Sequence, residues 1–473
     1  MSTGAKHLHG DRPEYLSACK RLTRFPSACI TRDKMNEKNK SVERVIGLDC
    51  HPDTFTAAAL RGATPAAALV EKVFNRVPLK QLSDWARKHS SAQDLFVLEA
   101  SGNSFQVARC LAALERSVTV LESCHLGQLK EAHANNDKIS AVRIAKAYLA
   151  GTAKEVWIPE LKTQERRDWF HAHRKATKRL TQVRNSLLSY LSDNGVRLKK
   201  GSRLTQPQVQ EQLRQSRQWS ARQWQVILIR LEDLHHADQQ RQHWRSLIAQ
   251  EVLQDPELLA IVRLCGVREM VAFALGAFVG DIKRFEHPKQ LVKYVGLNPA
   301  FDDSGQSRWR GGIGGHGHQH LRTLLIEAAH AILRSSKTTL ARWGKKLLRR
   351  KGQLNLVVAA IARKLTVAVW YLMMGRWTPL EEIDARLCLK VTKIIGQLGS
   401  EALKQLGKTR HALRQETYQS LKSGKTYVPT PTPQPAAAPT TTTPATVSYV
   451  LDPHKKFIPK AKDNTLAAEY GLR

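Results

Sequence analysis

Short apolar runs separated by polar turns make up the chain between residues 44 and 121. The polar sequence 50–53 contains a proline and an aspartate and lies between two such runs, a pattern typical of a β-hairpin. Apolar runs of this length predict strands over 44–49, 54–60, 69–75, 95–99 and 118–121. Apolar positions at helical spacing predict helices over 78–90 and 104–116 and a third helix that Asp137 opens. The pattern therefore predicts an α/β domain.

A helical pattern replaces these short runs after residue 160. Steps of four and three residues separate Trp169, His173, Ala176, Leu180, Val183, Leu187 and Tyr190, as in a heptad seam. A second helical pattern carries Trp224, Leu228, Leu231 and Leu234, lapses near Asp238 and Arg241, and resumes at Trp244, Leu247 and Ile248. One interpretation is a helical hairpin with a solvated face. We favour the other, a coiled-coil arm that dimerises and lies along nucleic acid, because 18 Lys and Arg accompany only 7 Asp and Glu between 161 and 250.

The order of the elements predicts several domains. Three strands, helix, strand, helix, strand, helix is the order of an RNase H-like, or RuvC-like, domain. The predicted fold class is thus α/β plus all-α, with a helical arm and then a mainly helical domain that has a helix-hairpin-helix-like element around Gly266. The predicted segments are a basic disordered extension (1–43), the RuvC-like domain (44–155), the coiled-coil arm (156–254), the mainly helical domain (255–400), and a basic helix, Pro/Thr-rich linker and tail (401–473).

Composition indicates the partner. The chain has 75 Lys and Arg against 41 Asp and Glu, a formal charge of +34, which favours a nucleic acid as ligand. The long apolar run 354–374 contains Arg363 and Lys364, so we interpret it as a buried core helix and expect no membrane association. Seven scattered cysteines without a CxxC pair indicate neither a disulfide framework nor a zinc ribbon, and a cytoplasmic location is expected.

Three acids occupy positions from which they could bind a metal ion. Asp49 and Glu99 end apolar strands, and Asp137 begins a helix. Each acid alone also fits a local role, in a turn or at a helix N-terminus. In this order, however, the three carboxylates could converge on Mg²⁺, which prefers oxygen ligands, and two such ions would support cleavage of a phosphodiester.

A second group of candidate residues follows at 296–351. Ser304 lies in a sequence typical of a turn, and it becomes a candidate nucleophile only because Arg308, Arg310 and a run of glycines, Gly312 among them, follow it. His316, His318 and His320 could bind zinc if they lay on a strand, but contact with phosphate or bases is favoured. Further candidates for binding nucleic acid are Arg322, Lys345, Lys346, Arg349 and Arg350. Gly266 fits either a phosphate-binding turn or a helix C-cap.

The motifs resemble those of the DEDD-type insertion-sequence transposases, which are relatives of the Piv DNA invertases. The resemblance extends over about residues 45–375. Its N-terminal motifs are Gly47-Leu48-Asp49, Leu98-Glu99-Ala100-Ser101-Gly102 and Asn136-Asp137-Lys138. Its C-terminal motifs are Gly280-Asp281-Ile282, Arg284-Phe285, Tyr294-Val295-Gly296-Leu297-Asn298-Pro299, Ser304-Gly305, Gly311-Gly312-Ile313 and His320-Leu321-Arg322.

The resemblance implies a transposase that recombines DNA under the direction of a structured non-coding guide RNA encoded by its element. It implies metal ligation by Asp49, Glu99 and Asp137, with Mg²⁺ as the ion and Mn²⁺ as a substitute. It also implies that Ser304 attacks DNA and forms a covalent phosphoserine. The sites would form across a homodimer, and dimers would assemble into a tetramer on DNA.

One departure from the family pattern concerns the metal site. The family's fourth acid falls three residues after the third, where this chain has Ser140. The loop before His320 also differs, with Gly and His where relatives tend to carry Lys and Asn. Two alternatives therefore stay open: a site-specific DNA invertase that needs no guide RNA, and a catalytically impaired relative that only binds nucleic acid.

Overall fold

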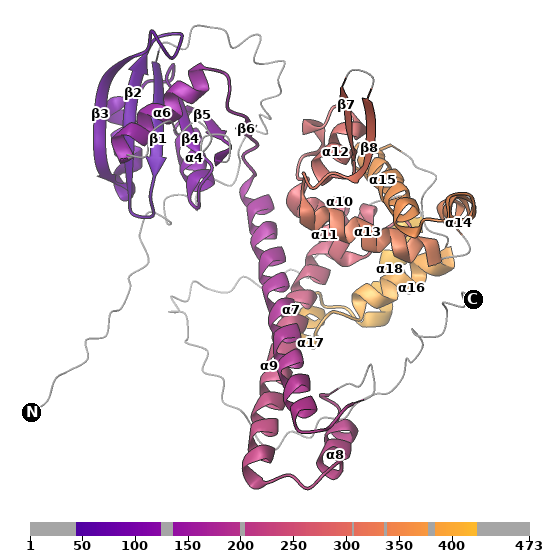
Figure 1. Ribbon diagram of the computed structural model, residues 1–473. Helices are drawn as coiled ribbons and strands as arrows, with labels where there is room; N and C mark the ends of the chain where they lie inside the picture. The colour runs from indigo at the N-terminus through magenta and orange to yellow at the C-terminus, as the bar shows by residue number, and fades with distance from the viewer. Residues whose placement is uncertain are drawn as a thin grey trace, which may run out of the picture. The chain divides into compact units, whose positions relative to one another are not determined.

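The computed structural model describes residues 44–123, 136–198, 204–304, 307–334, 338–376 and 384–422. The predicted extension at 1–43 and linker at 427–447 lie outside these residues. In the described part, a six-stranded sheet is followed by a mostly helical remainder (Figure 1). This confirms the predicted combination of an α/β part and a helical part, whereas the domain boundaries stay predictions.

The sheet joins an antiparallel meander to parallel strands. Its strands are β1 (Arg44–Cys50), β2 (Thr54–Arg61), β3 (Leu69–Pro78), β4 (Leu95–Glu99), β5 (Ser117–Leu121) and β6 (Glu155–Val156), in the order β3-β2-β1-β4-β5-β6. Strands β1, β4 and β5 are mutually parallel, and the other neighbours pair antiparallel. All five predicted strands are confirmed. The sequence pattern missed β6, since two residues carry no periodicity.

Helices pack against both sides of this sheet. They are η1 (Leu79–Gln81), α3 (Leu82–His89), α4 (Ser104–Ala112) and α6 (Asp137–Leu149). Apolar residues of α3 and α4 share one buried cluster with Ile46 and Leu48 of β1, and those of α6 share another with Val45. Gly47 permits the close approach of α6, because a Cβ atom there would lie 2.0 Å from the carbonyl oxygen of Ala141. This contact fixes the N-terminal half of α6 beside β1.

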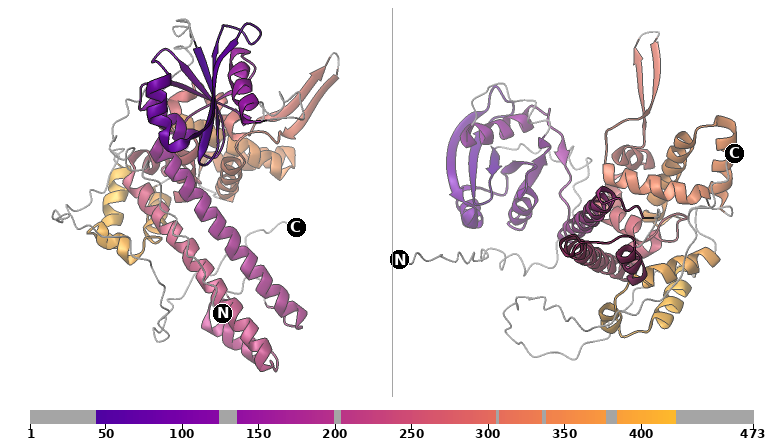
Figure 2. Two further views of the ribbon diagram at one scale, coloured as in Figure 1. Left: turned by 90° about the vertical axis from the view of Figure 1, so that its left-hand side faces the viewer. Right: turned by 60° about the horizontal axis from the view of Figure 1, so that its bottom comes forward.

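The predicted arm is a pair of long helices within one chain. It consists of α7 (Leu161–Asp193), α8 (Pro207–Gln215) and α9 (Ala221–Gln254), and α7 and α9 lie side by side (Figures 1 and 2). Hydrogen bonds from Arg230 to Ser186 and from Gln223 to Asn194 show that the two helices run antiparallel. Their seam is filled from within the chain, chiefly by leucines of both helices. The helical-hairpin interpretation describes this packing, and dimerisation stays a prediction.

The lapse in the apolar pattern of α9 does not interrupt the helix. The helix is continuous through Asp238 and Arg241, which form an ion pair of 2.7 Å one turn apart. Two opposite charges at this spacing satisfy each other on a helix surface. The lapse therefore concerns the apolar pattern alone, within one continuous helix.

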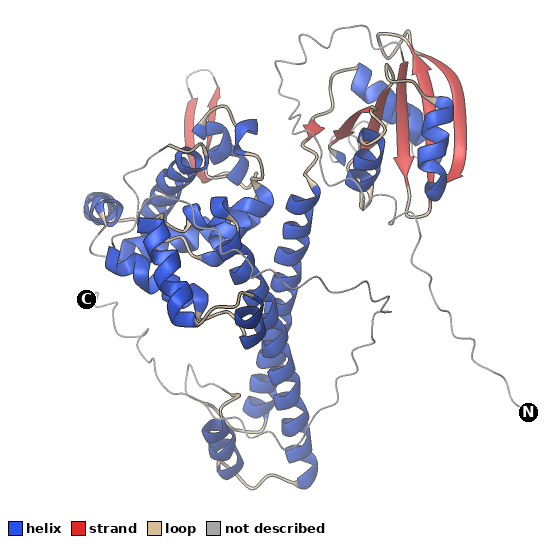
Figure 3. Ribbon diagram, turned by 180° about the vertical axis from the view of Figure 1, so that it is seen from behind, coloured by secondary structure: helices blue, strands red, loops and turns tan. Residues whose placement is uncertain are grey.

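Among the remaining residues that the structure describes, helices form a core beside one β-hairpin, and Figure 3 shows strands in this hairpin and in the sheet. The helices are α10 (Pro256–Ile261), α11 (Glu269–Phe278), η2 (Ile282–Arg284), α12 (Pro288–Val295), α13 (Gln319–Arg334), α14 (Thr339–Lys351), α15 (Leu354–Met373), α16 (Asp384–Ile395), α17 (Ser400–Gln405) and α18 (Arg410–Lys422). Helix α15 is long and apolar enough to cross a membrane, but half of its most apolar window is buried. Its residues join the main hydrophobic cluster, which confirms the predicted core helix.

A buried ionic network ties α7 and α9 to α10. The guanidinium of Arg166 contacts Asp255 and lies 2.7 Å from Glu251, while the Lys162 ammonium lies 2.9 Å from Asp255. Asp255 also caps α10 by accepting hydrogen bonds from the backbone N–H groups of Glu257 and Leu258. Burial acts to raise the pKa of Asp255, but hydrogen bonds from Lys162 and Arg166 outweigh it and lower that pKa to about 2.

We expect Asp255→Asn to lower the free energy of unfolding by about 3 kcal/mol, because Arg166 then stays buried with one carboxylate fewer. A carboxylate whose pKa is lower in the folded than in the unfolded chain stabilises the protein at pH values above the unfolded-state pKa. This contribution is lost as the pH falls towards the folded-state pKa of about 2. The difference between parent and variant should therefore shrink between about pH 4 and pH 2. Denaturant unfolding across this range measures it. Asp84→Asn, at an exposed pair with Arg87, should change stability by less than about 0.5 kcal/mol.

Candidate metal centre and nucleic-acid contacts

The ends of two parallel strands place Asp49 and Glu99 at one edge of the sheet. Leu48 of β1 pairs with Leu98 of β4, so the two acids follow at the same level. Both strands run in the same direction, and their carboxyl ends therefore share this edge, where α/β proteins commonly bind ligands.

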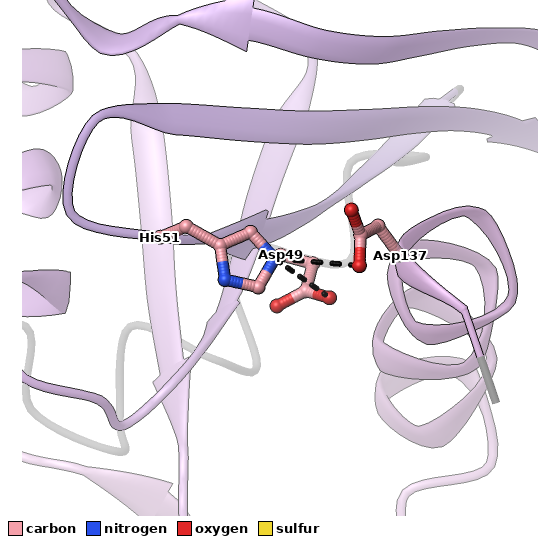
Figure 4. Close-up of side chains that lie close together, drawn as sticks. All are labelled: Asp49, His51 and Asp137. Carbon is pink, nitrogen blue, oxygen red and sulfur yellow. Dashed lines mark ion pairs between the residues drawn. The ribbon is translucent and has the colours of Figure 1, made fainter.

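The start of α6 brings Asp137 to Asp49. Asn136 caps the helix by accepting a hydrogen bond of 2.9 Å from the backbone N–H of Ile139, and Asp137 is the first residue of the helix. Ligand atoms of Asp49, His51 and Asp137 all lie within 4.8 Å of one another (Figure 4). Two of the three predicted acids thus belong to one group. Glu99 shares the sheet edge but is not a member of this group.

His51 is the member of the group that the sequence interpretation missed. The sequence indicates only that it lies in the turn 50–53, since a histidine beside a proline is unremarkable in a turn. Its Nε2 atom lies 3.5 Å from Asp137 Oδ1 and 3.9 Å from Asp49 Oδ2. This nitrogen is buried and makes no hydrogen bond with any part of the chain that the structure describes. A buried nitrogen usually has a hydrogen-bond partner. Together with the two carboxylates that it faces, this nitrogen forms a donor set that fits a divalent cation.

Arg76 is a second neighbour that no sequence signal indicated. Its Nε donates a hydrogen bond of 3.5 Å to Asp137, while three quarters of its side chain is exposed. Arg76 has a φ of 49°, which non-glycine residues seldom adopt, beside an irregularity in the pairing of β2 and β3. An exposed guanidinium beside the acids offers hydrogen-bond donors to a phosphate.

Ser140 occupies the position at which the family pattern has its fourth acid. It lies one turn after Asp137 in α6 and is partly buried, and its backbone N–H donates to the carbonyl oxygen of Asn136. Positions three residues apart share a face of a helix. Its position is therefore compatible with the side from which Asp137 meets the group, although a hydroxyl adds no charge there.

The segment with the candidate serine contains a β-hairpin. Ser304 ends β7 (Pro299–Ser304), and its backbone pairs with Ser307 at the start of β8 (Ser307–Ile313). Arg308, Arg310 and Gly312 follow on β8. The side chains of residues 301–310 lie outside the described part of the structure, so only the backbone places Ser304 and both arginines.

The three histidines after the hairpin lead into α13. His318 caps the helix, since its Nδ1 accepts a hydrogen bond from the backbone N–H of Leu321, and its ring packs on Phe278. Burial and then nearby positive charges, the largest from His320, lower the pKa of His318 to about 4, so the ring is neutral near pH 7. The pKa of His320 is lowered by burial and then by Arg174. Among the described residues the three histidines form no metal-binding group.

Arg322 and Gly266 have clear packing roles. The Arg322 guanidinium donates a hydrogen bond of 2.8 Å to the carbonyl oxygen of His316 and thus holds the loop that precedes α13. Gly266 has a φ of 76°, and a Cβ atom there would lie 2.8 Å from the carbonyl oxygen of Ala328. This close contact with α13 accounts for the glycine without a bound phosphate.

The basic residues of α14 form a surface. Lys346, Arg349 and Arg350 are exposed and Lys345 is partly buried. The structure gives these four side chains no ion pair with the described acids. Such a helix face suits the phosphates of a nucleic acid.

Comparisons with known proteins point to a family. Residues 260–344 match the "Transposase IS116/IS110/IS902 family". The transposase for insertion sequence element IS1111A of Coxiella burnetii is 36% identical over 116 residues, 24% of this chain and 32% of that protein. Putative transposase y4qE of Sinorhizobium fredii is 26% identical over 243 residues, 50% of this chain and 57% of that protein. A probable family 20 transposase of Pseudomonas aeruginosa is 32% identical over 129 residues, 27% of this chain and 38% of that protein.

These matches cover only part of each protein. The chain spans between 32% and 57% of the length of the three relatives. The family match includes the hairpin, all of α13 and the start of α14 up to residue 344, whereas Asp49, Glu99 and Asp137 precede it. It confirms the resemblance predicted from the motifs: residues 260–344 of this chain are similar to the "Transposase IS116/IS110/IS902 family".

Proposed function

We propose that this chain is the transposase of an insertion sequence and that it cuts and rejoins DNA. The observation that carries the proposal is the convergence of Asp49, His51 and Asp137 at the edge of the sheet, in a chain whose residues 260–344 match transposases. The net charge of +34 supports a polyanionic substrate. We further propose that the sheet domain is RuvC-like, for which the strand order and the position of the acids are the support.

The metal centre is proposed to hold Mg²⁺, or Mn²⁺ as a substitute, through the carboxylates of Asp49 and Asp137, with Glu99 at the same edge. A bound divalent ion would offset the charge of the phosphate in the cleavage step. Arg76 would contribute hydrogen bonds to a phosphate from beside Asp137. Carboxylates repel phosphates, so the acids would hold the DNA backbone only indirectly, through the bound ion and Arg76.

Ser304 is proposed as the nucleophile. Attack of its Oγ on a phosphodiester would form an O–P bond and break the bond from phosphorus to one strand oxygen, which takes up the proton. The product is a phosphoserine that preserves the energy of the broken bond for rejoining. Its place at the end of β7, beside a turn, is compatible with access to DNA.

A structured guide RNA and a homodimer that assembles into a tetramer are also proposed as partners, and their support is the family resemblance. Purification of the full chain from cells that carry the gene with its flanking DNA, followed by sequencing of bound nucleic acid, tests the guide. An enriched RNA encoded by the flank supports it. Recombination by protein free of RNA would favour the invertase without a guide.

The same preparation tests the activity. Strand cleavage of DNA that carries the element's ends should require a divalent ion and stop when the ion is chelated. Absence of cleavage and rejoining when a divalent ion is present, with DNA binding intact, would favour the impaired relative that Ser140 suggests. DNA binding without cleavage in any divalent ion would therefore contradict the proposed enzyme.

The basic face of α14 gives a prediction for binding. We expect Arg349→Ala with Arg350→Ala to weaken DNA binding and to reduce the slope of log affinity against log salt by about 1.8, because each phosphate contact contributes about 0.9. Filter binding between low and moderate salt measures the slope. The control is Lys80→Ala with Lys88→Ala, which removes the same charge from exposed positions near the sheet. An equal loss of slope in this control would show that only net charge matters.

A further inference from the structure

We infer that His51 is a direct nitrogen ligand of the divalent ion, that it takes the place of the acid replaced by Ser140, and that it makes the centre select Mn²⁺ over Mg²⁺. This inference rests on the proposed metal-dependent function. It goes beyond that function because it assigns a ligand outside the acid pattern and a preference among ions.

The backbone holds His51 in place without any ion. Its N–H donates a hydrogen bond of 2.8 Å to the carbonyl oxygen of Thr54, which closes the turn between β1 and β2. Its carbonyl oxygen accepts a hydrogen bond of 2.7 Å from the side chain of Asn103, at the start of α4. Two elements of the sheet domain therefore fix the residue, and a ligand fixed in advance loses little entropy when it binds.

The ring presents one nitrogen to the acids. In Figure 4 the Nε2 atom points at Asp49 and Asp137 from the end of the hairpin. The nitrogen is shielded from solvent and makes no hydrogen bond in the described structure, although 44% of the side chain is exposed. A buried ring nitrogen usually has a hydrogen-bond partner, so one without a partner between two carboxylates is accounted for by an ion that the three atoms share.

The chemistry of the donors sets the preference. Mg²⁺ favours oxygen ligands and retains its waters, whereas imidazole suits first-row transition ions. A fourth carboxylate at position 140 would have added negative charge and an oxygen ligand. The imidazole adds a nitrogen ligand and no charge, which weakens the site for Mg²⁺ more than for Mn²⁺.

Electron paramagnetic resonance of bound Mn²⁺ tests the inference without any activity measurement. The full-length parent should show spin-echo modulation from a coordinated nitrogen, and labelling histidine with ¹⁵N should change that modulation. His51→Gln should abolish it and weaken Mn²⁺ binding by at least about tenfold, the lower end of what losing a supporting group at a metal site costs. His236→Gln, at an exposed position of α9, is the matched control and should retain the modulation.

A competition titration tests the preference. Mg²⁺ should displace Mn²⁺ from His51→Asp at a lower concentration ratio than from the parent, because an oxygen ligand has replaced nitrogen. Since the side chain is half exposed, both variants should keep the parent's circular dichroism spectrum.

The possible failures differ from one another. Saturable Mn²⁺ binding without nitrogen modulation in the parent would overturn the role of His51 and leave the carboxylate centre standing. The alternative role of His51, a protonated counter-charge to both acids, would give this result. If the parent binds no Mn²⁺, or if Asp49→Asn leaves Mn²⁺ binding unchanged, both the inference and the proposed centre are overturned.

Discussion

Asp49→Asn is expected to abolish strand cleavage while DNA binding stays close to that of the parent. Asp49 contributes one of the two carboxylates that converge with His51, and asparagine removes a full ligand charge from the proposed centre. A bound metal ion supplies several kcal/mol of transition-state stabilisation. At about 1.4 kcal/mol per factor of ten, the cleavage rate should fall by at least about 100-fold. Single-turnover cleavage of labelled DNA, analysed on a denaturing gel, measures this rate.

Asp53→Asn is the matched control for this experiment. Asp53 is exposed and lies in the turn that follows β1, four residues after Asp49. The substitution removes the same charge as Asp49→Asn, but Asp53 is not among the residues whose ligand atoms converge. Glu99→Gln should also reduce cleavage, because Glu99 shares the sheet edge. Near-parental cleavage by Asp49→Asn in Mg²⁺ would place the centre elsewhere.

The sheet was predictable from sequence because its strands carry a strong local pattern. Continuous apolar runs such as 95–98 become strands buried on both faces, and the polar turn 50–53 joins β1 to β2 as expected. The position of Asp137 beside Asp49 was also accessible, since both acids end or begin an element. What placed them together is the close contact of Gly47 with α6, which no periodicity records.

The remaining parts of the site depend on contacts between residues far apart in the sequence or on local irregularities. His51 lies beside the acids only because the turn directs its ring towards a helix that begins 86 residues later. Arg76 reaches Asp137 from an irregular position of β3. The hairpin of Ser304 was missed because a glycine-rich and arginine-rich sequence has little strand propensity. Sequence patterns predicted that Asp49 and Asp137 would lie close together, but they indicated neither His51 nor Arg76.

The hydroxyl of Ser304 should decide whether DNA becomes attached to the protein. We expect Ser304→Ala to abolish recombination and to leave affinity for DNA nearly unchanged, because it removes one oxygen and none of the charge that dominates binding. The parent, denatured during the reaction, should give a covalent protein–DNA adduct, and the variant should give none. Ser307→Ala is the matched control, because Ser307 is also a serine and its backbone pairs with that of Ser304 in the same hairpin.

The control separates chemistry from hairpin structure. Both substitutions remove a hydroxyl from paired positions of β7 and β8, so an effect on the hairpin alone should be shared. Loss of the adduct with Ser304→Ala and its retention with Ser307→Ala would therefore assign the attacking oxygen. Cleavage by Asp49→Asn with a normal adduct would show, in turn, that the serine acts without the metal centre. An adduct that persists in Ser304→Ala would remove this serine from the mechanism and leave the metal centre to activate water or another hydroxyl as the nucleophile.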